Sequence, residues 1–273
     1  MHDALTVIAP TRGWAPIRLR ELWEYRQVLY FLIWRDIKVR YRQTLIGATW
    51  AIVQPVMTMV VFTIFFGRLA QMPSDGMPYA LFSFAALVPW GFFGGGLTQG
   101  TNSLIASGHI ITKVYFPRLL IPCARVLAGL PDLILAFVVL LGMMVWYRVP
   151  LRPLGLLCIP ALVVLMLATA IGVAVWLSAM SVKYRDVQHV IPYLVQVWLF
   201  ITPIAYPSSL VPDRWRAVYA LNPMVGVVEG FRWALLGEAP GLVLWPSILT
   251  AVLILLGGLF FFRRFERSFA DVI

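Results

Sequence analysis

The side chains of this chain that could do chemistry do not form a nucleotide-binding pattern. The three lysines, Lys38, Lys113 and Lys183, follow isoleucine, threonine and valine. A P-loop requires a Gly-Lys pair, because its glycine-rich backbone wraps the phosphates that the lysine contacts. The sequence therefore predicts that this chain does not bind ATP through such a loop, and we expect no cofactor on it.

The other reactive side chains are scattered. His2, His109 and His189 lack the spacing of zinc ligands, and no paired carboxylates suggest acid–base catalysis. Cys123 and Cys158 each lie among apolar residues, which is typical of small buried side chains rather than of a disulfide or a metal site. We therefore expect no catalytic or metal-binding residues.

Asp132 is the one acidic residue that lies clearly inside a long apolar segment. Arg125 precedes it by about two helical turns, which places both residues on one helix face about 10 Å apart. Asp132 could couple transport to an ion, since acids at mid-membrane depth often do so. It could also form a structural ion pair or a packing site beside Pro131. The structural interpretation is favoured, because a proton pathway needs more than one acid.

Long segments without charge make up most of the chain and decide its fold class. The clearest lies between Arg42 and Arg68, and the whole chain is 61% hydrophobic and 12% charged, against about 25% charged in soluble domains. A bilayer core about 30 Å thick takes roughly 20 helical residues. We predict an all-α integral membrane protein with six transmembrane helices, near residues 46–67, 79–102, 121–146, 154–181, 189–206 and 243–262.

The basic residues predict the orientation of these spans. Most lysines and arginines fall on the inner segments if the N-terminus is cytoplasmic, so the net charge of +10 indicates basic cytoplasmic loops rather than nucleic-acid binding. We expect a multi-pass protein of the inner (plasma) membrane with both termini in the cytoplasm. The expected divisions are a cytoplasmic N-terminus with an interfacial helix (1–44), a six-span membrane domain (45–265) and a cytoplasmic tail (266–273).

Residues 17–43 predict an amphipathic helix that lies in the membrane interface. Aromatic and basic side chains suit the level of the lipid headgroups, and the apolar run 28–34 is too short to cross the bilayer. On a helical wheel, one side holds Trp23, Tyr30, Trp34, Ile37 and Tyr41, and the opposite side holds Glu21, Glu24, Arg35, Lys38 and Arg42.

Residues 207–242 predict two short re-entrant helices on the outer side, between spans 5 and 6. Their apolar runs are too short to span, and Pro223 disfavours a helical conformation at Asn222. An ordinary extracellular loop is the alternative. On the inner side, the connections 103–118 and 182–188 are short, basic and aromatic. They could dock a soluble partner or only anchor the spans.

Taken together, these segments resemble a known family. Residues 35–50 (RDIKVRYRQTLIGATW) with Gln54 and Pro55 resemble the start of type-2 ABC exporter permeases for O-antigen, capsule and teichoic acid polysaccharides. Further matches follow in the same order over roughly residues 20–265: 113–118 (KVYFPR), 184–187 (YRDV), 202–207 (TPIAYP) and 221–224 (LNPM), with Glu229 and Arg232. Each motif is weak alone, but five in order make a specific pattern.

The resemblance implies the partners and the mechanism. The permease would form a homodimer that binds two copies of a soluble P-loop ATPase, and ATP and Mg would bind on that ATPase. A lipid-linked glycan would be the substrate. In the implied cycle, residues 106–118 insert into the ATPase, whose closure shifts spans 1 and 5 at the dimer interface and opens a channel.

The resemblance and the residue chemistry together give four sets of candidate residues. Arginine matches phosphate geometry, and sugar faces stack on aromatic rings, although packing or lipid contact is the alternative for each aromatic residue. The ATPase-coupling set is Ala106, Ser107, His109, Lys113, Tyr115, Phe116, Arg118, Lys183, Tyr184, Arg185 and Asp186. The substrate would enter at Arg35, Lys38, Arg40, Tyr41 and Arg42. The channel-lining set is Trp50, Phe62, Phe65, Phe66, Trp90, Phe92 and Trp198. The outer-gate set is Asn222, Pro223, Glu229 and Arg232.

Three other functions stay open. A type-2 ABC exporter of a drug or small lipid would share the fold. An ion-coupled secondary transporter would need acids in several spans, and a membrane-embedded lipid-modifying enzyme would need clustered acids or histidines. The sequence offers Asp132 alone for the second and no such cluster for the third.

Overall fold

The structure is a computed structural model, and it describes residues 19–42, 48–111, 113–237 and 244–266. Its described residues are helical or in turns, with no strand among them, which confirms the all-α class. Residues 43–47, which belong to the motif before the first span, lie outside the described residues. So do His2, residues 17–18 and 238–242, and the tail after Glu266.

Five helical segments are long and apolar enough to cross a membrane. They cover Thr49–Leu69, Tyr79–Ala106, Leu120–Trp146, Pro153–Lys183 and Leu244–Phe265. The first joins α3 (Ala48–Phe62) to a π-helical segment (Thr63–Leu69), and the second, fourth and fifth are α4 (Tyr79–Ala106), α8 (Pro153–Lys183) and α12 (Leu244–Phe265). The protein is therefore a multi-pass membrane protein.

The segment expected as the span 189–206 is shorter than predicted. It forms α9 (Val187–Ile201), which has 15 residues and a length of about 22 Å at 1.5 Å per residue. The helix ends because Thr202 precedes Pro203, and a residue before proline is pushed out of the helical region. Thr202 is extended, with ψ of 144°.

The third span is two helices rather than one. α6 (Leu120–Leu127) ends at Ala128, and α7 (Leu130–Trp146) begins after Gly129. Pro131 is in the first turn of α7, where its missing N–H is tolerated, whereas in a continuous helix its ring would clash with the Leu127 carbonyl. This break inside the membrane span separates Arg125 from Asp132.

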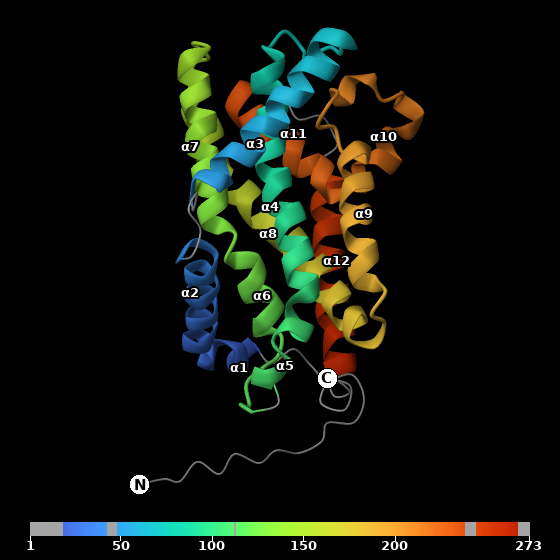
Figure 1. Cartoon of the computed structure of the whole chain (residues 1–273). Coiled ribbons are helices and arrows are strands. Elements are labelled where there is room, and N and C mark those ends of the chain that lie inside the picture. The colour runs from blue at the N-terminus through green and yellow to red at the C-terminus, as the bar shows by residue number, and fades with distance from the viewer. Residues whose placement is uncertain (1–18, 43–47, 112, 238–243, 267–273) are drawn as a thin grey trace.

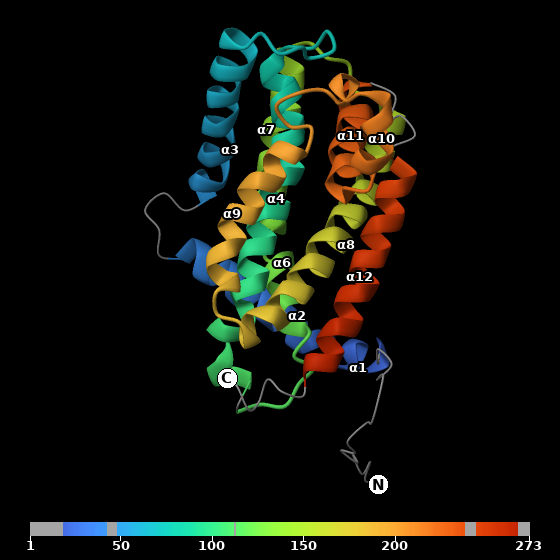
Figure 2. The ribbon, with the colours of Figure 1, turned by 90° about the vertical axis from the view of Figure 1, so that its right-hand side faces the viewer.

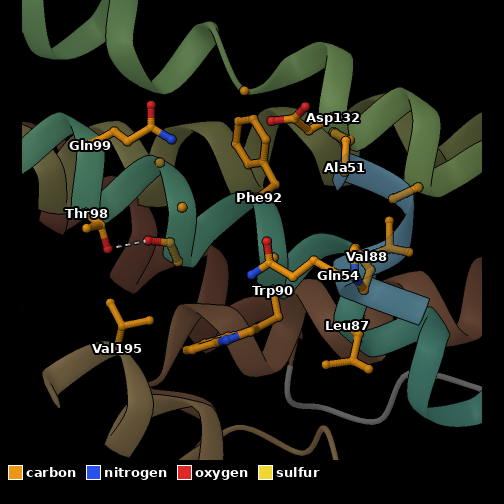
Figure 3. A pocket seen from close by; sticks show the side chains of 18 of the residues that line it. Ala51, Gln54, Leu87, Val88, Trp90, Phe92, Thr98, Gln99, Asp132 and Val195 are labelled. Atoms are coloured by element: carbon orange, nitrogen blue, oxygen red, sulfur yellow. Dashed lines mark hydrogen bonds between the residues drawn. The ribbon is translucent and has the colours of Figure 1, made fainter. Parts of the chain in front are cut away.

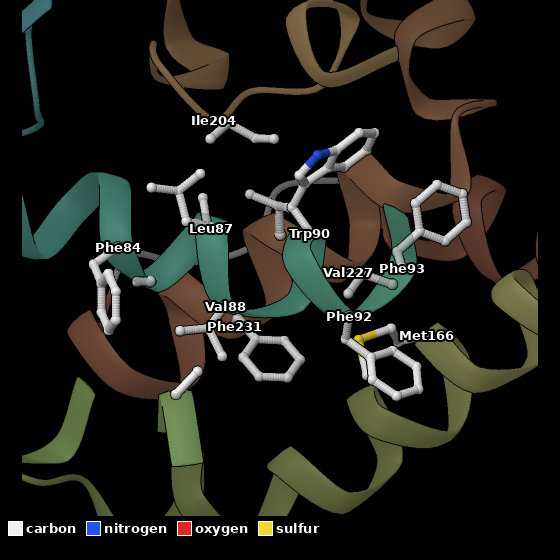
Figure 4. Close-up of a cluster of buried hydrophobic side chains, with 14 of the residues drawn as sticks. Phe84, Leu87, Val88, Trp90, Phe92, Phe93, Met166, Ile204, Val227 and Phe231 are labelled. Atoms are coloured by element: carbon white, nitrogen blue, oxygen red, sulfur yellow. The ribbon is translucent and has the colours of Figure 1, made fainter. Parts of the chain in front are cut away.

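α4 is the central helix of the bundle. Of the residues in its most apolar stretch, 83% are buried, against 6% for the α3 span. Figures 1 and 2 show α4 surrounded by the other long helices, with α3 along one side. A helix that is apolar all round suits this place. Figure 4 shows its aromatic side chains, including Phe84, Trp90 and Phe93, packed with Met166 and Phe231.

The remaining short helices mark the two ends of the bundle. α1 (Leu19–Glu24), α2 (Arg26–Arg42) and α5 (Gly108–Ile111) lie at one end, which we call the α2 end. The other end, the α10 end, holds α10 (Asp213–Ala220) and the adjoining α11 (Pro223–Leu236). The helix break predicted at Asn222 is confirmed, since Asn222 is the N-cap of α11 and Pro223 its first residue.

α2 packs against α6, and most of its aromatic side chains face away from the bundle. Leu32 and Asp36 are its buried residues, whereas Trp23 of α1 and Tyr30 and Trp34 of α2 are 70%, 68% and 47% exposed. Trp23, Tyr30 and Trp34 on the aromatic side of the predicted wheel therefore face outward. Tyr41 on the same side turns toward the bundle and donates a hydrogen bond to Asp132. The buried side carries an acid, Asp36, for which the wheel gave no role.

Candidate functional site: a cavity beside the central helix

A cavity of about 1030 Å³ lies between α4, α3, α7 and α9, and reaches α2 and α6 at the α2 end. Figure 3 shows side chains from these helices around one space, with Gln54, Trp90, Thr98 and Asp132 among them. Its wall consists of Arg40, Tyr41, Trp50, Ala51, Gln54, Pro55, Thr58, Leu87, Val88, Trp90, Gly91, Phe92, Gly94, Gly95, Gly96, Thr98, Gln99, Arg125, Gly129, Asp132, Leu133, Ala136, Pro192, Val195 and Leu199.

The wall is apolar with a few polar groups, which is the usual character of a ligand site. Thr98 donates to the Gly94 carbonyl at 2.9 Å, as the dashed line in Figure 3 marks, and Thr58 donates to the Gln54 carbonyl at 3.0 Å. Gln54 is exposed. The amides of Gln54 and Gln99 were not among the predicted channel residues, although a glutamine inside an uncharged span is the signal that could have identified them.

Three of the seven predicted channel-lining aromatics line this cavity: Trp50, Trp90 and Phe92. Trp198 packs edge-on against Phe93 with ring centroids 5.0 Å apart, and its indole N–H donates to Asn222 at 2.9 Å.

The other three lie along the α3 span. Phe62 is buried against Phe66, with ring centroids 5.2 Å apart, and Phe65 is 57% exposed.

Two ion pairs join α2 to the helices of the broken span. Asp132 accepts hydrogen bonds from the Arg40 guanidinium and from the Tyr41 hydroxyl, and Arg40 also donates to the Gln99 side chain. Asp36 pairs with Arg125, with Nε to Oδ2 at 3.2 Å, and with its neighbour Arg35 at 2.9 Å. Arg125 and Asp132, which are expected on one helix face, do not pair with each other, because each pairs with a residue of α2. Asp132 is in an ion pair, as one of its two interpretations expects, but the partner is Arg40 of α2.

The five residues predicted where the substrate enters have different surroundings. Arg40 and Tyr41 line the cavity, and Arg35 pairs with Asp36. Lys38 lies 5.4 Å from the Trp34 ring centroid, and Arg42 is exposed. Burial and the hydrogen bond to Asp132 raise the pKa of Tyr41 to about 12, so its hydroxyl stays a donor at neutral pH.

The predicted coupling residues lie at the α2 end, and they divide into exposed and buried groups. Tyr115 and Tyr184 are 66% and 53% exposed. Phe116 is buried in the core, and the Arg118 guanidinium donates to the Glu266 carbonyl at 2.7 Å. The rest of the exposed group is Ala106, His109, Lys113, Lys183, Arg185 and Asp186, whereas Ser107 is buried.

Two of the four predicted outer-gate residues, Glu229 and Arg232, form one network at the α10 end. Asn222 bonds instead to Trp198, Thr202 and Met224. Arg232 is 1% exposed, donates to Glu229 at 3.2 Å and to the Ile204 carbonyl at 3.1 Å, and lies 3.6 Å from the Phe82 ring centroid. Ser208 donates to Glu229 at 3.0 Å. This network joins α11 to α4 and to the segment after α9.

Comparison with known proteins identifies the family. Residues 27–236 match the ABC-2 type transporter family. The chain is 30% identical over 220 residues to the O-antigen export system permease protein RfbA of Myxococcus xanthus, covering 79% of this chain and 83% of that protein. The protein of the same name from Klebsiella pneumoniae is 24% identical over 88% of this chain and 92% of its own length. The polysialic acid transport protein KpsM of Escherichia coli is 24% identical over 75% and 80%.

A chain with this fold, this cavity and this match belongs to the ABC-2 type transporter membrane family. The predicted resemblance to that family is thereby confirmed. Proteins of this class are transport subunits rather than enzymes.

Proposed function

We propose that the chain is the permease subunit of an ATP-driven exporter that moves a lipid-linked polysaccharide from the cytoplasmic side across the inner membrane. The observation that carries the proposal is the similarity along most of the chain to permeases named for O-antigen and polysialic acid transport. The aromatic and amide side chains on the cavity wall suit a sugar chain, since sugars offer apolar ring faces and many hydroxyl groups.

The cavity supports a dimer as the working unit. Gln54 and Thr58 of α3 line its wall, and Gln54 is exposed on the α3 side of the single chain. Polar groups facing lipid cost free energy, so a second copy that covers this side would complete a channel. In this proposal α9 and the segment after it form a sixth span, and α10 and α11 form the re-entrant pair at the outer mouth.

The ATPase would dock at the α2 end. Exposed Tyr115 lies after α5, and the exposed residues 183–186 form the turn between α8 and α9. Both connections are basic, which by the positive-inside rule supports a cytoplasmic location for this end. In this proposal both chain termini are cytoplasmic as well. Two copies of a separate P-loop ATPase would bind here, with ATP and Mg on those subunits.

Deletion of the gene tests the proposal. The expected result is loss of the surface glycan with accumulation of its lipid-linked precursor in the cytoplasmic leaflet, measured by glycan staining of intact cells and by extraction of lipid-linked saccharides. Complementation with the unaltered gene is the control. Normal surface glycan in the deletion strain would reject polysaccharide export and leave another type-2 ABC export activity.

A further inference from the structure

The α2 end of the cavity is built around one carboxylate. Asp132 of α7 accepts from the Arg40 guanidinium and from the Tyr41 hydroxyl, both on α2. Gln99 of α4 accepts from the same guanidinium. All four residues line the cavity, and so does Arg125. The Asp132 carboxylate therefore occupies hydrogen-bond donors on the cavity wall that a bound substrate could also use.

Asp132 is partly accessible from that space, unlike the acid of the neighbouring pair. The side chains of Asp132 and Arg40 are 32% and 23% exposed, whereas the Asp36 side chain is 5% exposed. A partly solvated ion pair is weak, because water solvates both charges when the pair separates. A buried pair is costly to break, because each charge is then left without a partner. The Asp132 pair can thus exchange with a solute while the Asp36–Arg125 pair persists.

The donors suit a phosphate group as well as they suit a carboxylate. The fork of an arginine side chain matches phosphate oxygens, and hydrogen bonds between ionised partners are stronger than neutral ones. Two arginines, Arg40 and Arg125, face the cavity there, and Asp132 is the acid among the lining residues. When Asp132 withdraws, the Arg40 guanidinium and the Tyr41 hydroxyl are left for the phosphate, beside Arg125, which stays paired with Asp36.

We propose that Asp132 is an internal placeholder for the phosphate group of the lipid-linked substrate, which displaces it and thereby releases α2 from α7. This inference rests on the proposed export of a phosphate-bearing lipid. α2 stays attached to the bundle through Leu32 and the Asp36–Arg125 pair on α6. Displacement therefore frees α2 from α7 while its contact with α6 holds, which opens the cavity between α2 and α7.

The test uses the full chain in phosphatidylcholine nanodiscs. Spin labels go on cysteines at Val39 and Ile134, which are 70% and 61% exposed, after Cys123 and Cys158 are replaced by alanine. The probe is polyprenyl diphosphate. Its affinity and the distance between the labels are measured for the unaltered protein and for Asp132→Asn, Asp132→Ala and Arg40→Gln.

The proposal expects the diphosphate to lengthen the label distance in the unaltered protein. Asp132→Asn and Asp132→Ala should show the longer distance without ligand and bind roughly two- to fivefold tighter, the range that a weak ion pair allows. Arg40→Gln should lose most of the binding. Glu24→Gln, which removes an acid from an exposed pair on α1, is the control for net charge and should change neither quantity.

Several results would overturn the placeholder role. One is unchanged or weaker binding in both Asp132 variants. Another is the same shift with neutral polyprenol, which would assign binding to the apolar chain. A shift with phosphatidylglycerol alone would assign the site to membrane lipid instead of substrate. The deletion experiment measures the surface glycan independently of Asp132. If the glycan is lost on deletion but the Asp132 variants behave like the unaltered protein, the placeholder role is rejected and the proposed function is retained.

Discussion

The side chain of Asn222 forms hydrogen bonds with two helices, α9 and α11, at the α10 end. Its Oδ1 accepts from the Met224 backbone N–H at 3.1 Å, which caps α11, and from the Trp198 indole of α9 at 2.9 Å. Its Nδ2 donates to the Thr202 hydroxyl at 3.2 Å, where α9 ends. The residue predicted from sequence as a helix break and gate position thus joins the ends of α9 and α11.

Asn222→Ala should destabilise the protein by about 2 kcal/mol. The lost cap costs about 1 kcal/mol, and the half-buried Trp198 N–H left without an acceptor costs about 1 kcal/mol more, the low end for an unpaired polar group. The measurement is the thermal unfolding temperature of the full chain in detergent, which should fall by several degrees. Asn222→Asp keeps the acceptor oxygen and is the matched control, with a smaller expected fall. Equal unfolding temperatures for the alanine variant and the unaltered chain would contradict this role.

At the scale of elements, α8 and α12 approach each other through glycines. A Cβ atom at Gly172 would lie 2.8 Å from the Leu255 backbone nitrogen and Cα. Gly258 on α12 faces the Gly172 carbonyl in the same contact. Backbone atoms cannot move aside as a flexible side chain can, so small residues are required where two membrane helices pack this closely.

Gly172→Leu should therefore separate α8 from α12, at a cost of about 1–3 kcal/mol or more, typical of overpacking. The matched control is Gly257→Leu, because nothing lies within 4 Å of a Cβ there and leucine favours helix more than glycine does. Unfolding in detergent should show a lower midpoint for Gly172→Leu and an unchanged or higher one for Gly257→Leu. Similar midpoints for the two variants would argue against the close contact.

At the scale of the whole molecule, one side of the bundle is incompletely covered. α3 lies beside α4 on the side away from α12, as Figure 2 shows, and its span is 6% buried. This side of the bundle also contributes the polar side chains Gln54 and Thr58 of α3 to the cavity wall. A second copy of the chain is the partner that would cover both.

Single cysteines along α3 should cross-link two copies if this side is the dimer interface. In a chain without Cys123 and Cys158, cysteines replace exposed residues on α3 and on the π-helical segment that follows it, and mild oxidation in native membranes follows. Dimers on denaturing gels should recur every three or four positions, since one helix face meets its symmetry mate. The positions are Met57, Val60, Val61, Ile64 and Phe65.

Exposed positions on α12 are the control for this experiment. Leu249 and Leu253 are 61% and 60% exposed and belong to α12, which lies on the opposite side of the bundle from α3. They should give monomers. Dimers from the α12 positions alone would move the interface to that side and leave the cavity without its proposed cover.

The sequence by itself determined that the chain crosses a membrane and where several helices end. Both properties are local, because a span depends on a run of uncharged residues and a proline acts on its immediate neighbours. The break at Asn222 and Pro223 could be predicted for this reason. A proline also marks the end of α9, before Pro203, and the break of the third span at Gly129. At both places the long apolar run predicts one continuous span, and this prediction hides the effect of the proline.

Only the tertiary structure decided which charged and aromatic residues meet. Arg125 and Asp132 share a helix face in a continuous span, but the break between α6 and α7 and the packing of α2 give each of them a partner on α2. Trp90, Phe92 and Phe62 all belong to the buried core, but only Trp90 and Phe92 also line the cavity. These contacts join residues far apart in the chain, and local periodicity carries no information about which surfaces of separate helices pack together.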